Sequence, residues 1–282
     1  MSRGRRHNWA DKPATVFFRI LQGAVLIFAL LPPVIIVTLS FFGDVFVNFP
    51  PQRPTTDLYH QLVTTPAWRD SFVFTVKLAA PVAVLSILIA VPAVFALQRS
   101  AVKGKSVLQF IVLLPMLLPQ TGFAIALYTV YLRMGWVNEF GPLTIAQVVT
   151  AIPIGFMIIY ATLQRLPERV EFVAMALGSG RIRAMTDISL PLLIPAIMAA
   201  ALFAIISVFD DVLLTTFLGG PDTITVSRAI FLMIQTKLNP VIVAVAATLT
   251  VVTTVLTLSA LAARGRSNAV SVPDDSASEE SA

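Results

Sequence analysis

Two adjacent carboxylates, Asp210 and Asp211, interrupt a long apolar stretch of this sequence. A charge at the centre of a membrane-spanning helix costs about 2.5–3.5 kcal/mol on insertion scales, so such residues usually face a cavity or a partner. Two interpretations stay open: the pair lines a pathway for cations, or one aspartate caps a helix break or bonds to a neighbouring span. Because adjacent residues point roughly 100° apart on a helix, at most one is expected to face a pathway.

The sequence lacks the residue patterns that most catalytic and metal-binding sites require. Cysteine is absent, and the only histidines, His7 and His60, stand in no metal-ligand spacing. No Ser/His/Asp arrangement suggests a nucleophile. The Gly-Lys-Ser triplet at 104–106 resembles the end of a phosphate-binding loop, but Arg99 occupies the position of its first glycine. We therefore expect no catalytic residue, no metal, no cofactor and no nucleotide site in this chain.

The elements that position the two aspartates are expected to be membrane helices. Hydrophobic residues make up 57% of the chain and charged residues 12%, against about a quarter charged in soluble domains. An all-α membrane protein follows, because in lipid a helix satisfies its own backbone polar groups. Six uncharged stretches can cross roughly 30 Å of hydrocarbon: 20–42, 78–97, 107–132, 140–164, 188–209 and 238–263. The fifth span is expected to begin near Leu192 and to reach about Leu218, with both aspartates inside it.

The distribution of Lys and Arg predicts the orientation of the spans. With the N-terminus in the cytoplasm, 14 of the 20 basic residues lie on the inner side, and both termini are cytoplasmic. The net charge of +5 is thereby explained without nucleic-acid binding. The expected organisation is a cytoplasmic N-terminal segment (1–16), a six-helix transmembrane domain (17–264) and a disordered, Ser- and acid-rich cytoplasmic tail (265–282).

The inner loop 165–191 is too long and too patterned for a simple connector. Pro167 and acidic residues predict the start of a short helix over 168–177. Gly178 and Gly180 are expected to end it. A second short helix should follow from about Arg181 until Pro191 interrupts it. From the residues alone, a solvated amphipathic connector remains the alternative.

The loop resembles the EAA loop of permease subunits of binding-protein-dependent ABC importers. The family pattern is Glu-Ala-Ala, three residues, Gly, nine variable positions, Ile, one unspecified residue, Leu and Pro. The positions in register are Ala174, Gly178, Ile188, Leu190 and Pro191. The chain departs at the start, where Phe172 and Val173 replace the family Glu and first Ala, while Glu171 lies one residue earlier.

The resemblance implies a MetI-like fold and a multi-pass subunit of the bacterial inner membrane that forms half of a solute pathway. The loop would be the coupling helix that enters a groove on an ATPase, which hydrolyses the ATP. The implied partners are two ATPase copies, a second and different permease chain (a heterodimer), an extracytoplasmic solute-binding protein and membrane lipid. The coupling residues would be Glu171, Ala174, Gly178, Ser179, Gly180, Arg181, Arg183, Ile188, Leu190 and Pro191.

Segments 207–211 and 216–221 are similar to elements of spermidine/putrescine-type permeases, as are Phe49-Pro-Pro and Asn239-Pro240. This resemblance favours a polyamine as the solute, with an aminophosphonate or another small solute as the alternative. An ion-coupled secondary transporter is more remote, because such proteins usually carry paired inverted repeats. A channel would need a re-entrant filter or charge rings, and neither is evident.

Overall fold

The computed structural model describes residues 11–43, 50–100, 103–236 and 239–269. Within these ranges every named secondary-structure element is a helix. The one β-contact within them is an isolated bridge between Phe42 and Pro54. The helices are α1 (Asp11–Leu39), α2 (Asp57–Thr64), α3 (Pro66–Arg99), α4 (Lys105–Leu117), α5 (Gln120–Met134), α6 (Phe140–Leu163), α7 (Arg169–Ala176), α8 (Arg181–Ala184), α9 (Leu190–Asp210), α10 (Leu213–Leu218), α11 (Val226–Thr236) and α12 (Val241–Ala269), with a π-helical turn, Met185–Ser189, between α8 and α9.

The chain divides into two compact units. One contains α1, α2 and the first part of α12, and the other contains α3 to α11 with the rest of α12. In the first unit, the hydroxyls of Ser40 and Tyr59 lie 2.6 Å apart, which joins the end of α1 to α2. The second unit contains all the candidate site residues.

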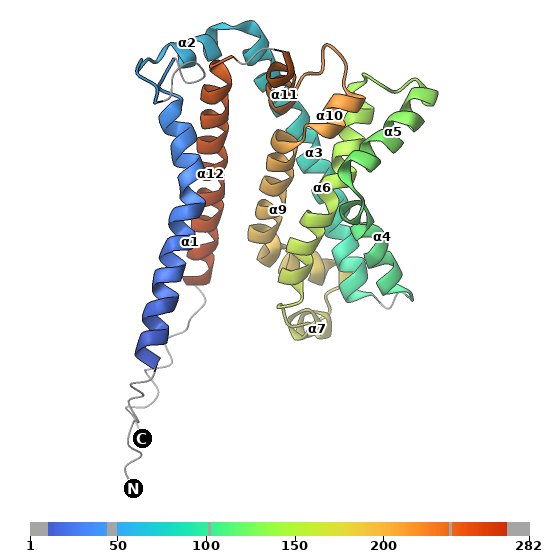
Figure 1. Cartoon of the computed structure of the whole chain (residues 1–282). Helices are drawn as coiled ribbons and strands as arrows, with labels where there is room; N and C mark the ends of the chain where they lie inside the picture. Colours follow the sequence, from blue (N-terminus) through green and yellow to red (C-terminus); the bar gives the residue numbers. More distant parts are fainter. Residues whose placement is uncertain (1–10, 44–49, 101–102, 237–238, 270–282) are drawn as a thin grey trace. The chain divides into compact units, whose positions relative to one another are not determined.

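Three long helices, α3, α6 and α9, pack against one another and form the core of the second unit (Figure 1). Near the loop that carries α7, the core contains Val94, Phe156 and Leu193, one residue from each helix. Toward the other end, α5 and α10 join the same three helices around a second apolar cluster. This bundle supports the loop 165–191.

Small residues allow α6 and α9 to approach closely. A Cβ added to Gly155 would lie 3.6 Å from the Cβ of Ala200, at van der Waals contact. Helices in lipid depend on such packing, because lipid tails give them no hydrophobic drive to associate.

We therefore expect Gly155→Leu to separate α6 from α9 and to lower stability by about 1–3 kcal/mol, the usual cost of overpacking. Gly141, also on α6, has no atom within 4 Å of a Cβ added there, so Gly141→Leu is the matched control. Thermal unfolding in detergent measures the difference, and equal midpoints for the two variants would contradict close packing at Gly155.

Four helical stretches are long and apolar enough to cross a membrane: Val16–Leu39, Pro66–Arg99, Phe140–Leu163 and Arg181–Asp210. The pair α4 and α5 makes a fifth if it counts as one bent span. Of α12, the stretch Val241–Val255 qualifies as a shorter apolar helix. The expected count of six spans and the cytoplasmic termini therefore remain predictions.

The expected third span, 107–132, is wrong as a single helix, because α4 and α5 are bent by 97° at their junction. Leu118 adopts an extended conformation (ψ 140°) before Pro119. A proline lacks the N–H that would continue the helix, and it disfavours helical geometry in the preceding residue.

The expected extension of the fifth span through both aspartates is also wrong. Helix α9 ends at Asp210, Asp211 is extended (ψ 119°), and a separate helix, α10, begins at Leu213. The cause is local, since the Asp211 carboxylate accepts hydrogen bonds from the free N–H groups at the start of α10.

The predicted terminal segments are only partly described. In the N-terminal segment 1–16, residues 1–10 lie outside the described residues and α1 begins at Asp11. In the tail 265–282, α12 continues to Ala269 and residues 270–282 lie outside the described residues.

Candidate functional site

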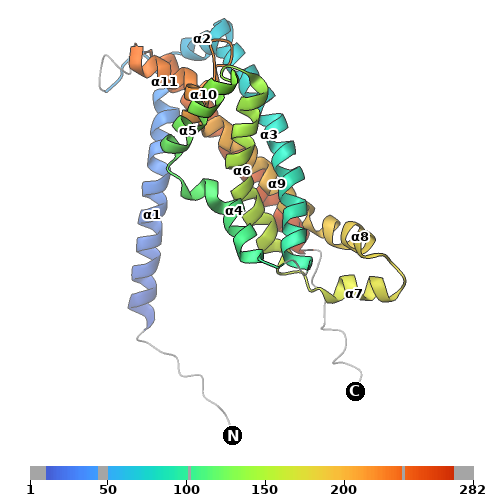
Figure 2. The same cartoon turned by 90° about the vertical axis from the view of Figure 1, so that its right-hand side faces the viewer.

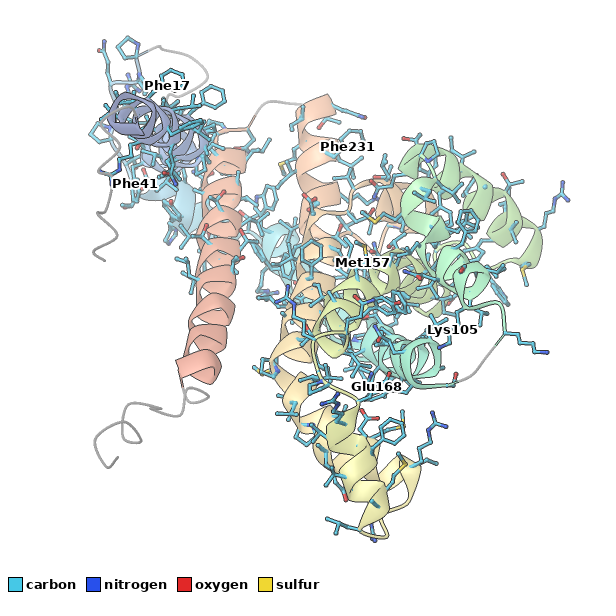
Figure 3. The ribbon with its side chains drawn as sticks, turned by 90° about the horizontal axis from the view of Figure 1, so that it is seen from below. Phe17, Phe41, Lys105, Met157, Glu168 and Phe231 are labelled. Carbon is cyan, nitrogen blue, oxygen red and sulfur yellow. The ribbon has the colours of Figure 1, made fainter. Side chains whose placement is uncertain are left out.

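The loop 165–191 folds into two short helices that project beyond one end of the bundle. Figure 2 shows α7 and α8 projecting to the side at the lower part of the bundle, with α7 below α8. The first helix spans Arg169–Ala176, which confirms the predicted helix to within one residue at each end. Seen from below, Glu168 lies at the base of the loop, where the loop leaves the bundle (Figure 3).

Gly178 ends α7, as predicted, by adopting a left-handed conformation (φ 95°). Its N–H donates to the Met175 carbonyl at 3.0 Å, and the N–H of Ser179 donates to the Ala174 carbonyl at 3.0 Å. These two hydrogen bonds form the Schellman motif, in which glycine is favoured because it carries no Cβ. Ala174 and Ser179 thus belong to the turn through their backbone, and Gly180 begins α8 with an ordinary extended conformation.

The second helix of the loop does not stop at Pro191, which corrects the prediction of an interruption there. From Arg181 the helix continues through the π-helical turn into α9. In that turn the N–H of Leu190 bonds five residues back, to Met185. The widened turn accommodates Pro191, which cannot donate the next bond. Ile188 and Leu190 are half-buried in this continuous helix.

Large apolar side chains are exposed on the loop, outside the bundle. Phe172 and Val173 are each 60% exposed, and Leu177 is 84% exposed. Ile182 on α8 is 78% exposed, and Arg181 and Arg183 beside it are also exposed. An exposed apolar patch with a polar rim is typical of a protein-interaction site.

Glu171 does not belong to this exposed surface, although we expected it to contact the ATPase. It is 6% exposed, and its carboxylate accepts hydrogen bonds from Arg99 at 2.9 Å and from the Ser189 hydroxyl. By sequence, Arg99 is only one of the 14 basic residues on the predicted inner side. The pairing spans 72 residues of sequence, so no local pattern could have revealed it.

The acidic pair separates into one buried and one exposed aspartate. Asp211 is 5% exposed, and its carboxylate caps α10 by accepting hydrogen bonds from the N–H groups of Leu214 (3.3 Å) and Thr215 (3.1 Å). It also accepts hydrogen bonds from the side-chain amides of Gln120 (3.0 Å) and Gln147 (2.8 Å). Asp211 therefore links the α9/α10 break to the α4/α5 break and to α6, which is the structural role left open by the sequence.

Asp210, by contrast, is exposed and lines a cavity of about 430 Å³ between α4, α5, α6, α9 and α10. The polar residues of the wall are Asp210, Asp211, Gln120, Gln147, Thr150 and Ser207. The remaining wall residues are apolar, and the wall, as far as the described residues form it, contains no Lys, Arg or His. The Asp211 oxygens already accept four hydrogen bonds, so Asp210 is the exposed carboxylate of this wall.

We expect Asp211→Ala to lower stability by about 2–5 kcal/mol, since it removes a helix cap and leaves buried donors without a partner. The exposed Asp210→Asn change should leave stability nearly unaltered, which makes it the control. Thermal unfolding of both purified variants in detergent provides the measurement. A midpoint for Asp211→Ala close to that of the parent chain would contradict the role of Asp211 as a link between the helix breaks.

The comparison with known protein families assigns more than half of the chain to a family of transport proteins. The family described as binding-protein-dependent transport system inner membrane component matches residues 94–268. This range includes the loop 165–191 and both aspartates.

Curated relatives cover most of the chain. The trehalose/maltose transport system permease protein MalG of Thermococcus litoralis is 27% identical over 75% of this chain and 80% of its own length. The putrescine transport system permease protein PotI of Escherichia coli is 28% identical over 68% and 71%. The spermidine/putrescine transport system permease protein PotC of Escherichia coli is 25% identical over 86% and 92%.

Among solved structures, a chain of a bacterial ABC transporter involved in the import of the acidic polysaccharide alginate shares the fold. The TM-score is 0.68 at 14% sequence identity, and the match covers 93% of this chain and 99% of that chain. A chain of an amino acid ABC transporter matches with a TM-score of 0.58 at 16% identity, over 75% and 99%.

Proposed function

The chain belongs to the family of inner-membrane components of binding-protein-dependent transport systems, and on that premise we propose that it carries a cationic amine, a polyamine such as putrescine or spermidine, in an ATP-driven importer. As a member of this family it is a multi-pass inner-membrane permease subunit of an ABC importer with the MetI-like fold. The proposal concerns its solute, its coupling loop and its partners.

The cavity beside Asp210 carries the proposal for the solute. A carboxylate among neutral amides and hydroxyls, with no basic residue in the described wall, favours a cation over an anion. An aminophosphonate bears a negatively charged group that this wall would repel. The relatives PotI and PotC, named for putrescine and spermidine/putrescine transport, favour the same class, whereas MalG is named for sugars.

The exposed loop supports the proposal for coupling. Its apolar patch, which includes Phe172, Val173 and Leu177, would enter a groove on an ATPase subunit, and the basic residues Arg181 and Arg183 would pair with acids at the groove's rim. The continuous helix from Arg181 to Asp210 then joins that contact to the wall of the cavity. When the ATPase closes, this helix would move as a rigid body and would thereby displace Asp210.

The partners we propose are two ATPase copies, a second and different permease chain that completes the pathway, and an extracytoplasmic solute-binding protein. Each permease would contribute its own loop 165–191, so a pathway between two permeases would present two loops to two ATPases. The inner side is then the α7 end of the bundle and the outer side is the α10 and α11 end (Figure 1).

Uptake of labelled putrescine and spermidine into cells with blocked polyamine synthesis tests the solute. We expect deletion of the gene to reduce uptake and the parent gene, but not Asp210→Asn, to restore it. Unchanged uptake of both amines after deletion would remove the polyamine proposal and leave the membership of the importer family in place.

A further inference from the structure

A buried ion cluster joins the base of the loop to the bundle. Arg99, the last residue of α3, has a side chain that is only 5% exposed, and the Glu171 side chain is 8% exposed. The Arg99 guanidinium donates to Glu171 Oε1 at 2.9 Å, to Glu168 Oε1 at 3.0 Å and to the Leu166 carbonyl at 3.1 Å.

The same cluster reaches the start of α9. Ser189, the last residue of the π-helical turn, donates its hydroxyl to the Glu171 carboxylate. Four parts of the chain therefore meet at one point: the end of α3, the entry to the loop at Leu166, α7 itself and the turn that leads into α9. The ion pairs Arg69–Asp70 and Arg183–Asp187, by contrast, link residues that are only one or four apart in sequence.

The cluster contributes more to the orientation of α7 relative to the bundle than to the free energy of unfolding. A buried ion pair is often no more stabilising than apolar residues of the same size, because both charges lose their hydration. Its planar guanidinium, however, holds three acceptors in a fixed geometry. Helix α7 has one buried residue, Glu171, so apolar packing alone does little to fix the angle between α7 and the bundle.

We propose that Arg99 is a positioning residue that locks the loop 165–191 to the ends of α3 and α9, so that a push on α7 moves the bundle instead of bending the loop. The inference rests on the proposed role of this loop in coupling. Without the lock, the ATPase would still bind the loop and hydrolyse ATP, but the movement would be lost at the base of α7.

Distances between spin labels test the lock in the full chain in lipid nanodiscs. Since the chain has no cysteine, pairs introduced by substitution are labelled uniquely. Val173→Cys on α7 and Leu88→Cys on α3, both exposed, report the angle of the loop. Leu88→Cys with Met157→Cys on α6 reports the bundle itself.

The variant to compare is Arg99→Gln/Glu171→Gln, which removes both charges and so leaves no buried charge unpaired. We expect the loop pair to lose its single narrow distance and the bundle pair to keep its own. Ser189→Ala should broaden the loop distance less. Arg69→Gln, which disrupts an exposed ion pair at the other end of α3, is the matched control and should change neither distance. A loop distance that stays narrow in the double variant would overturn the inference.

A functional readout separates this inference from the proposed function. In the reconstituted importer, with labelled putrescine as the probe, we expect the double variant to hydrolyse ATP while losing most of its putrescine transport per ATP. Full transport per ATP in the double variant would also overturn the lock. If the parent chain fails to bind or stimulate the ATPase, the coupling proposal fails, and the label distances still decide whether Arg99 positions the loop.

Discussion

Gly178→Trp is expected to abolish solute uptake while the chain still inserts into the membrane. Gly178 ends α7 with φ 95°, and no atom lies within 4 Å of a Cβ built there. The tryptophan would therefore project from the loop surface instead of clashing within the chain. A left-handed conformation costs a non-glycine residue about 1–2 kcal/mol, and a blocked contact at the centre of an interface costs about 2 kcal/mol or more. The strain is the same in the free and the docked loop, so the loss of docking follows from the blocked contact and is about thirtyfold or greater.

Gly104→Trp is the matched control for this substitution. Gly104 precedes α4 with φ 81°, and it too has no atom within 4 Å of a built Cβ. Both variants thus suffer the same backbone strain, but only Gly178 lies in the loop 165–191, for which we propose the coupling role. Normal uptake by a stably expressed Gly178→Trp chain, or equal loss in the two variants, would count against the role of the loop.

Asp210→Asn is expected to reduce the uptake of putrescine about tenfold to a hundredfold at low solute concentration. A hydrogen bond to a charged group contributes about 1.5–3 kcal/mol, and about 1.4 kcal/mol corresponds to a factor of ten. Asp210→Glu keeps the charge and should retain most of the uptake. The measurement is the initial rate of labelled putrescine uptake at matched expression.

Asp222→Asn serves as the control for Asp210→Asn, because Asp222 is exposed and lies outside the wall of this cavity. Its uptake should equal that of the parent chain. Equal uptake by the Asp210→Asn chain and the parent would show that Asp210 does not face the solute pathway, whatever the solute class.

The sequence predicted the long apolar helices and the end of α7 well, because a long uncharged apolar stretch and a helix-ending glycine are local signals. It did not predict the break at Pro119, since packed membrane helices tolerate prolines and many of the prolines here lie inside helices. Whether a proline kinks a helix or separates two depends on what the freed backbone groups meet.

The site was predicted less completely, because its decisive contacts are distant in sequence. The sequence identified Asp210 and Asp211 but left their roles open, and the amides that bind Asp211 lie 91 and 64 residues away, at Gln120 and Gln147. Glu171 was expected on the surface, since a charged residue in a short amphipathic helix is usually solvated. Its burial depends on the ion pair with Arg99. In the sequence, the positive charge of Arg99 was already explained by the excess of basic residues on the inner side of the membrane.

The most direct test of the proposed function is the coupling of transport to ATP in proteoliposomes that contain this chain, its partner permease, the ATPase pair and the solute-binding protein. Accumulation of labelled putrescine and hydrolysis of ATP are measured on the same vesicles. We predict accumulation that requires ATP and stops when the ATPase subunits carry an inactivating substitution. Putrescine accumulation driven by an ion gradient in vesicles without ATPase subunits would contradict an ATP-driven importer.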